Sequence, residues 1–145
     1  MFATLAGSTL TFILQRNAAR QAEQFTREQQ LWHERIAAYS TFAAALTDFR
    51  RSQNDRWHLE QEDPRSPQLV LARDESYKLC ASATAELCRV RLVCGSLDLS
   101  QQAQAALDAT TEVHLALDEQ DRAGRGEKAR LALEHFLADA SAHVN

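Results

Sequence analysis

One helical pattern runs without interruption from about Thr4 to Asp63-Pro64, and it limits the fold more than any other feature of the chain. At 1.5 Å per residue, a helix of nearly 60 residues would measure about 90 Å. Helices of globular domains usually run about 8–20 residues. The apolar residues that define one face of this helix recur at steps of three, four or seven: Phe25, Trp32, Ile36, Tyr39, Ala43, Leu46 and Phe49.

The rest of the chain predicts three shorter helices. Pro64 and Pro67 end the first helix, and Ser66 followed by Pro67 is typical of a helix start. The second helix ends at Gly95, a residue suited to the position after a helix C-terminus. With only 4 Gly and 2 Pro and abundant Ala, the composition favours helices throughout.

The third and fourth helices are bounded by weaker signals. Asp98 or Ser100 is expected to cap the third helix, and the stretch AGRGE is expected to form the turn before the fourth. In that turn Gly124 and Gly126 are free to adopt positive φ. The sequence therefore predicts an all-α protein.

Short loops between helices favour an up-down antiparallel bundle. The expected lengths of about 28, 20 and 16 residues for the later helices cover only the C-terminal half of the first. We therefore expect residues 1–28 to form an apolar anchor and stalk, and residues 29–145 to form the helical bundle domain.

The apolar N-terminus, MFATLAGSTLTFIL, has two interpretations. No charge precedes it and no small-residue cleavage site follows it, which argues against a secretion signal. Fourteen residues span about 21 Å of a hydrocarbon core about 30 Å thick, so a complete membrane span would need an upstream start. The association face for lipid or a neighbouring helix comprises Ala3, Gly7, Leu10, Thr11, Ile13 and Leu14.

Basic residues after the run favour the membrane interpretation. Arg16, Arg20 and Arg27 would hold this end at the cytoplasmic side by the positive-inside bias. The alternative is a soluble homo-oligomer, or a subunit of a larger assembly, that pairs through the first helix. Its pairing surface would comprise Leu10, Ile13, Leu14, Ala18 and Phe25.

Composition and motifs argue against several classes of function. A net charge of −4 lacks the basic excess of a nucleic-acid binder. The 3 Cys cannot form a full disulfide framework, and they lack the spacing of a metal site, so a buried, reduced state is expected. The histidines form neither paired Glu-x-x-His motifs nor a zinc helix, and no nucleophile or phosphate-loop motif occurs. We expect no enzyme activity, no cofactor and no metal.

Aromatic residues on the first helix are expected to pack in the core. They are Trp32, Tyr39, Phe42, Phe49 and Trp57. Near the end of that helix, exposed Trp57 and His58 would make a docking edge. A ligand-sensing bundle, a third class of function, would need a cavity lined by these aromatic residues.

Two further stretches carry a family resemblance. Ala38-Tyr39-Ser40-Thr41-Phe42 lies in the charged helix, and Arg89 to Ser96 forms a later corner with Val93-Cys94 before Gly95. In this arrangement the chain resembles a group of small actinobacterial helical proteins of unknown function with an N-terminal apolar anchor. The resemblance implies an architecture and a location, and no activity.

The sequence thus predicts a non-enzymatic, membrane-tethered helical interaction module at the inner face of the bacterial cell membrane. Its expected partners are lipid or a partner helix at residues 1–14, an unknown protein, and a second copy of the chain. The alternative location is the cytoplasm.

Overall fold

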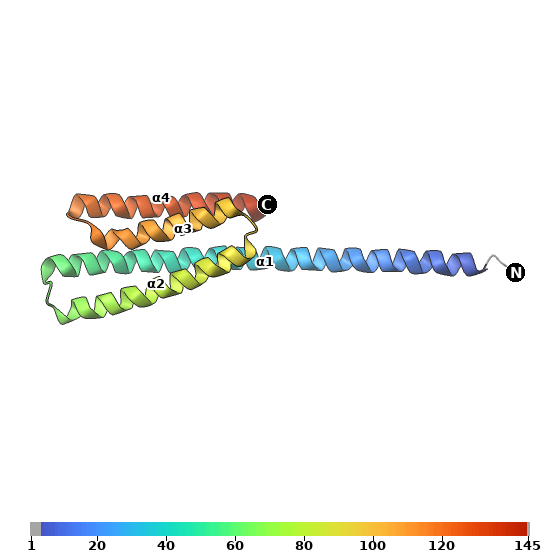
Figure 1. The fold of residues 1–145 in the computed structure, drawn as a ribbon, viewed down its shortest axis with the longest axis horizontal. Coiled ribbons are helices and arrows are strands. Elements are labelled where there is room, and N and C mark those ends of the chain that lie inside the picture. The colour runs from blue at the N-terminus through green and yellow to red at the C-terminus, as the bar shows by residue number, and fades with distance from the viewer. Residues whose placement is uncertain (1–3, 145) are drawn as a thin grey trace. The chain divides into compact units, whose positions relative to one another are not determined.

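The computed structural model describes residues 4–144, with side chains from residue 11 onward. All the described elements are helices (Figure 1): α1 (Thr4–Glu62), α2 (Pro67–Val93), α3 (Leu97–Thr111), the 3-10 helix η1 (Glu112–Leu115) and α4 (Glu119–Val144). The all-α fold and the unbroken first helix are therefore confirmed. The chain divides into two units, one up to Glu34 and one from Arg35 onward, although α1 runs through both.

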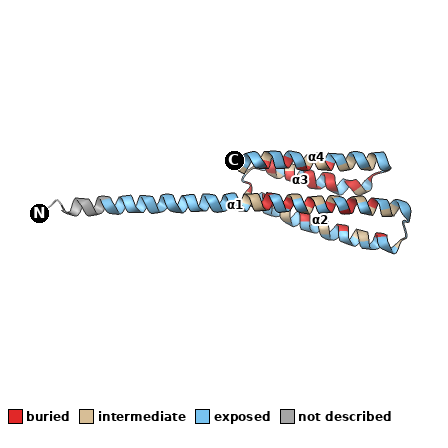
Figure 2. Cartoon of the chain, turned by 180° about the vertical axis from the view of Figure 1, so that it is seen from behind, coloured by how far each residue is buried: buried red, intermediate tan, exposed pale blue. Residues whose placement is uncertain are grey.

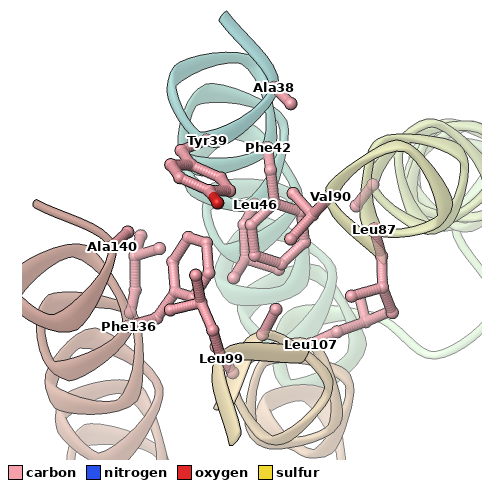
Figure 3. Packing of buried hydrophobic residues seen from close by; sticks show 14 of the residues in the cluster. Ala38, Tyr39, Phe42, Leu46, Leu87, Val90, Leu99, Leu107, Phe136 and Ala140 are labelled. Atoms are coloured by element: carbon pink, nitrogen blue, oxygen red, sulfur yellow. The ribbon is translucent and has the colours of Figure 1, made fainter. Parts of the chain in front are cut away.

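In the second unit, α1 to α4 run alternately up and down and enclose one main apolar core (Figure 1, Figure 2). Beside it, Ala109, Val113 and Ala129 form a smaller buried cluster. Each helix contributes to it, with Phe42 from α1, Leu87 from α2, Leu107 from α3 and Phe136 from α4 (Figure 3). Of the aromatic residues expected in the core, those from Tyr39 onward are buried, whereas the prediction is wrong for Trp32, which is 44% exposed. The core thus joins the C-terminal part of α1 to the three later helices.

The boundaries of α2 agree with the sequence prediction. Ser66 caps its N-terminus, where the Leu69 amide donates to Ser66 Oγ at 3.2 Å, and Pro67 takes the first helical position. At the other end Gly95 has a φ of +61°, and a Cβ there would meet an Arg35 guanidinium nitrogen at 3.3 Å. Glycine is therefore favoured at this corner by its positive φ, whereas an added Cβ would displace only the end of the Arg35 side chain.

The start of α3 differs from the prediction. The cap is Ser96, whose Oγ accepts the Leu99 amide at 3.3 Å, and neither Asp98 nor Ser100 caps it. Because Gly95 reverses the chain at once, the next residue already has the extended conformation of a helix cap.

The turn before α4 was also predicted in the wrong place. Gly124 and Gly126 lie inside α4, and the connection is formed by residues 116–118. Asp118 accepts the Asp121 amide at 2.8 Å, and Asp121 in turn accepts the Leu117 amide at 3.0 Å. These reciprocal caps, with the Asp121–Arg125 ion pair at 3.0 Å, start the helix before the glycines. Their contribution offsets the cost of about 1 kcal/mol for each helical glycine.

The position of Gly124 leads to a stability prediction. A Cβ added at Gly124 would have no atom within 4 Å. Gly124→Ala is therefore expected to raise the free energy of unfolding by about 0.5–1 kcal/mol. Gly95→Ala is the matched control and should lower that free energy by about 1–2 kcal/mol, because its φ is positive. Urea unfolding of both variants measures the two effects. A loss of stability in Gly124→Ala would contradict the placement of this residue inside α4.

Candidate functional site

The first unit exposes every side chain described from Thr11 to Glu34. Six of these side chains are large and apolar, and the most exposed are Phe12 at 64%, Phe25 at 63% and Leu14 at 62%. The others are Ile13, Leu31 and Trp32. An apolar surface of this extent on one helix is typical of a segment that contacts a partner.

The predicted association face falls partly within this surface. Thr11, Ile13 and Leu14 are exposed on α1. Ala3 lies outside the described residues, and the side chains of Gly7 and Leu10 are likewise not described. The basic residues Arg16, Arg20 and Arg27 follow on the same helix and are exposed.

The predicted transmembrane helix is not supported by the part of the chain that the structure describes. In that part, none of the helices combines the length and the hydropathy that a membrane crossing needs. The polar and charged residues from Gln15 onward account for this result, because every window of sufficient length includes them.

The predicted docking edge at the end of α1 needs correction, because Trp57 is buried, with 6% of its surface exposed. Its indole N–H donates to the Ala116 carbonyl at 2.9 Å, and the Arg122 guanidinium carbon lies 5.5 Å from the ring centroid. The turn after η1 covers Trp57, although the sequence places this residue near a helix end. Only His58 of the predicted pair is exposed.

A buried polar cluster joins α1, α2 and the end of α3. The side chain of Gln53 is 1% exposed and lies at its centre. Its Oε1 accepts the Ser76 hydroxyl at 2.5 Å, and its Nε2 lies 2.9 Å from the Thr111 carbonyl and 2.8 Å from His114 Nδ1. One signal for this cluster is visible in the sequence pattern, since Gln53 falls between Phe49 and Trp57 on the apolar face of α1.

Burial and the nearby Arg56 lower the pKa of His114 from its usual value of 6.5. The ring is half-buried, and Arg73 of α2 acts in the same direction as Arg56. His114 Nδ1 lies 2.8 Å from the Gln53 amide nitrogen and 2.8 Å from the Thr111 carbonyl. Without a proton, Nδ1 accepts the Gln53 amide hydrogen, whereas with a proton it donates to the Thr111 carbonyl and faces the Gln53 donor.

This pKa shift predicts a pH dependence. Below pH 6.5 the unfolded chain binds more protons at His114 than the folded chain, so the free energy of unfolding should fall as the pH drops below that value. His114→Gln should flatten this slope, whereas the same replacement at the exposed His143 serves as the matched control. Urea unfolding at several pH values measures the slopes, and an unchanged slope in His114→Gln would contradict the assignment.

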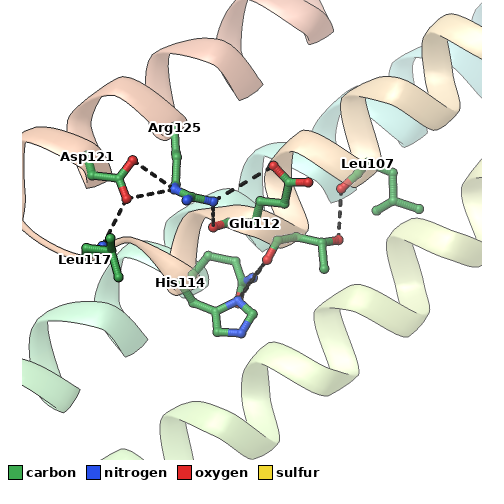
Figure 4. A network of polar contacts seen from close by, with 8 residues as sticks. Leu107, Glu112, His114, Leu117, Asp121 and Arg125 are labelled. Atoms are coloured by element: carbon green, nitrogen blue, oxygen red, sulfur yellow. Dashed lines mark hydrogen bonds and ion pairs between the residues drawn. The ribbon is translucent and has the colours of Figure 1, made fainter.

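A second polar network lies beside this cluster and holds η1 against α4. Arg125 of α4 pairs with Asp121 at 3.0 Å and donates to the Glu112 carbonyl at 3.4 Å (Figure 4). Because these contacts join η1 to the first turns of α4, they fix the turn that covers Trp57.

The remaining candidates for chemistry do not converge. Cys94 is buried as expected, but Cys80 is only half-buried and Cys88 is exposed, so the prediction of three core cysteines is wrong for Cys88. Among the residues with described side chains, no group of three or more His, Cys, Asp or Glu is placed to hold a metal ion. A shallow apolar groove lies between α1 and α4, lined by residues that include Ile36, Leu137 and Val144.

These observations define an all-helical bundle protein whose second unit is built around one apolar core and one buried polar cluster. Residues 36–144 match the family model described as KilB plasmid transfer protein. The chain therefore belongs to the KilB plasmid transfer protein family. The match covers the helical bundle, and the apolar segment of the sequence resemblance lies before it. No curated protein and no solved structure matches the chain.

Proposed function

We propose that this protein is a non-enzymatic helical interaction module that acts in plasmid transfer and attaches to the inner face of the cell membrane through the first unit. The description of its family supports the process. A non-enzymatic role is supported by the buried polar cluster, in which Gln53 bonds to both Ser76 and His114. Their polar groups thereby stabilise the bundle.

The attachment to lipid rests on one observation: a run of exposed apolar residues on α1, followed directly by a basic residue. Phe12, Ile13 and Leu14 are each more than half exposed, and Arg16 follows within the same turn. Burying an apolar side chain of this size contributes about 1.5–3 kcal/mol. An arginine near an anionic lipid surface contributes about 1 kcal/mol.

Together these two contributions favour insertion of the apolar residues at the boundary between headgroups and acyl chains. Attachment of this kind requires no membrane-spanning helix. The basic residues would remain among the anionic headgroups, as the positive-inside bias predicts for the cytoplasmic side.

Flotation with phosphatidylcholine vesicles containing phosphatidylglycerol tests the proposal. The full chain is expected to float with the vesicles, and the triple variant Phe12→Ser, Ile13→Ser, Leu14→Ser should remain in the dense fraction. The matched control replaces three exposed leucines of the bundle, Leu115, Leu117 and Leu131, with serine and should float like the unaltered chain. Replacing Arg16, Arg20 and Arg27 with glutamine should weaken the binding and its salt dependence.

A plasmid-transfer assay with the same variants tests the process. In a host whose plasmid transfer requires this protein, the Phe12–Leu14 variant should lower the transfer frequency more than the bundle control. If the unaltered chain does not float, or if the Phe12–Leu14 variant floats undiminished, lipid attachment is wrong. If the variant loses transfer although the chain never floats, the segment docks on protein, as in the oligomer hypothesis.

A further inference from the structure

The outer face of α2 carries a second exposed apolar surface, separate from the first unit. The opposite face of α2 is buried through residues such as Leu69, Ala83 and Leu87. The rest of the helix is half-buried or exposed (Figure 2). We name as the outer stripe the following exposed residues: Val70, Asp74, Tyr77, Ala81, Ala85, Cys88 and Leu92.

The exposure of the large members of the outer stripe is high. Leu92 is 86% exposed, Tyr77 63% and Val70 57%. Tyr77 is held on one side by Arg56, whose guanidinium carbon lies 5.8 Å from the ring centroid. The bundle therefore orients this ring and leaves most of it uncovered.

The spacing of the outer stripe is symmetric about Ala81. The steps from Val70 to Ala81 are four, three and four residues, and the steps from Ala81 to Leu92 are again four, three and four. Each half spans eleven residues, which is close to three full turns of an α-helix. The outer stripe therefore runs nearly straight along α2. Two copies of α2 that cross antiparallel at Ala81 would therefore align member with member.

The aligned members are complementary in size. Val70 of one copy would meet Leu92 of the other, and Tyr77 would meet Ala85. At the centre Ala81 would meet its own equivalent, where two small side chains allow a close approach of the helices. Each contact occurs twice, as a two-fold symmetric interface requires.

The charges of α2 agree with the same alignment. Asp74 of one copy would lie opposite Cys88 and next to Arg89 of the other, which gives two identical ion pairs. Among the described residues Asp74 makes no ion pair, and Arg89 reaches Glu86 only at 3.9 Å. A parallel alignment would instead place Asp74 against Asp74 and Arg89 against Arg89, which is unfavourable.

We infer that the outer stripe is a self-association surface, on which a second copy of this chain docks with its α2 antiparallel. The symmetric spacing identifies the partner, because an unrelated partner would not require a stripe that is complementary to itself. This interface is independent of the proposed lipid attachment, since it uses no residue before Val70.

A disulfide test measures the alignment directly. Residues 74 and 88 of one α2 are about 21 Å apart along the axis, too far for a disulfide within one chain. In the antiparallel pair they are opposite each other, so Asp74→Cys should crosslink two chains through the native Cys88 on oxidation. Asp74→Cys combined with Cys88→Ser is the control and should remain uncrosslinked.

Sedimentation equilibrium of the full chain measures the association itself. Ala81→Glu places two carboxylates at the symmetry axis and should weaken dimerisation by at least about tenfold. Ala138→Glu, on the exposed side of α4, is the matched control and should leave it unchanged. Asp74→Arg should also weaken the dimer, and adding Arg89→Asp should restore it.

Three results would overturn the inference. The first is a chain that stays monomeric at every concentration reached, and the second is a dimer that Ala81→Glu does not weaken, which would place the interface elsewhere. The third is oxidation of the unaltered chain to a Cys88–Cys88 dimer as fast as Asp74→Cys crosslinks to Cys88, because the antiparallel alignment places the two Cys88 residues apart. Under this inference Ala81→Glu weakens dimerisation and leaves vesicle flotation unchanged. A failure of the self-association can therefore be distinguished from a failure of the proposed lipid attachment.

Discussion

Replacing Phe136 with alanine is expected to lower the free energy of unfolding by about 3–5 kcal/mol. The ring is fully buried and connects α4 to α1. It packs edge-on against Phe42, with centroids 5.3 Å apart, and against Tyr39 at 5.8 Å (Figure 3). Removing it leaves a cavity and also breaks two aromatic contacts, each of which contributes about 0.5–1.5 kcal/mol beyond the buried area.

Urea unfolding followed by circular dichroism checks this prediction. The neighbouring Leu137 is 37% exposed, so Leu137→Ala is the matched control and should cost less than about 1 kcal/mol. Because domains of this size are stable by about 5–15 kcal/mol, Phe136→Ala should unfold at a clearly lower urea concentration. Equal effects of the two variants would show that the core does not centre on Phe136.

The second large effect is expected from Gln53→Met, which should lower the free energy of unfolding by about 2–4 kcal/mol. Methionine keeps the approximate volume and removes every polar atom. The buried Ser76 hydroxyl then loses its acceptor, and the Thr111 carbonyl and the half-buried His114 Nδ1 lose the Gln53 amide. A buried group left without a partner costs about 1–3 kcal/mol. The loss at Thr111 and His114 is smaller, because in the tautomer with a proton on Nδ1 this nitrogen donates to the Thr111 carbonyl at 2.8 Å.

A double-mutant cycle distinguishes this cause from a simple change of packing. Ser76→Ala removes the hydroxyl that Gln53 satisfies, so Gln53→Met should cost less in that background. The interaction energy from the four urea unfolding curves measures the coupling. Strictly additive effects would contradict the role of the hydrogen bond between these two side chains.

The sequence was sufficient to predict the fold class and the corners that depend on special residues. Ser66 and Pro67 start α2, and Gly95 ends it with a positive φ, because each of these residues has a local conformational preference that the fold uses. The long α1 was equally predictable, since nothing in the segment before Pro64 disfavours a helix.

The turn before α4 could not be found in this way. Residues 116–118 contain neither Gly nor Pro, whereas Gly124 and Gly126 indicated a turn where the structure has a helix. The deciding contacts are the reciprocal caps of Asp118 and Asp121 and the ion pairs of α4. Each contact is weak on its own, and their combined effect is not visible in a pattern of apolar residues.

The surroundings of Trp57 and Gln53 depend on residues far away in the sequence. Trp57 is covered by Ala116, and Gln53 bonds to Ser76 and His114, each from another helix or turn. Periodicity places both side chains on the apolar face of α1 and cannot identify these partners. The exposure of the first unit, in contrast, was expected from the length of α1 relative to the later helices.

The continuity of α1 has a consequence for how the chain opens to solvent. The helix is unbroken at Arg35, but tertiary packing begins only there, so its backbone hydrogen bonds are of two kinds. The backbone hydrogen bonds from Ala38 onward open when the apolar core unfolds, whereas the hydrogen bonds before Glu34 can open by local fraying. In proteins most of the stability of a helix comes from tertiary packing, so a bound partner would raise the protection of the amides in the first unit. Amide protection along a single helix would therefore report whether the first unit is occupied.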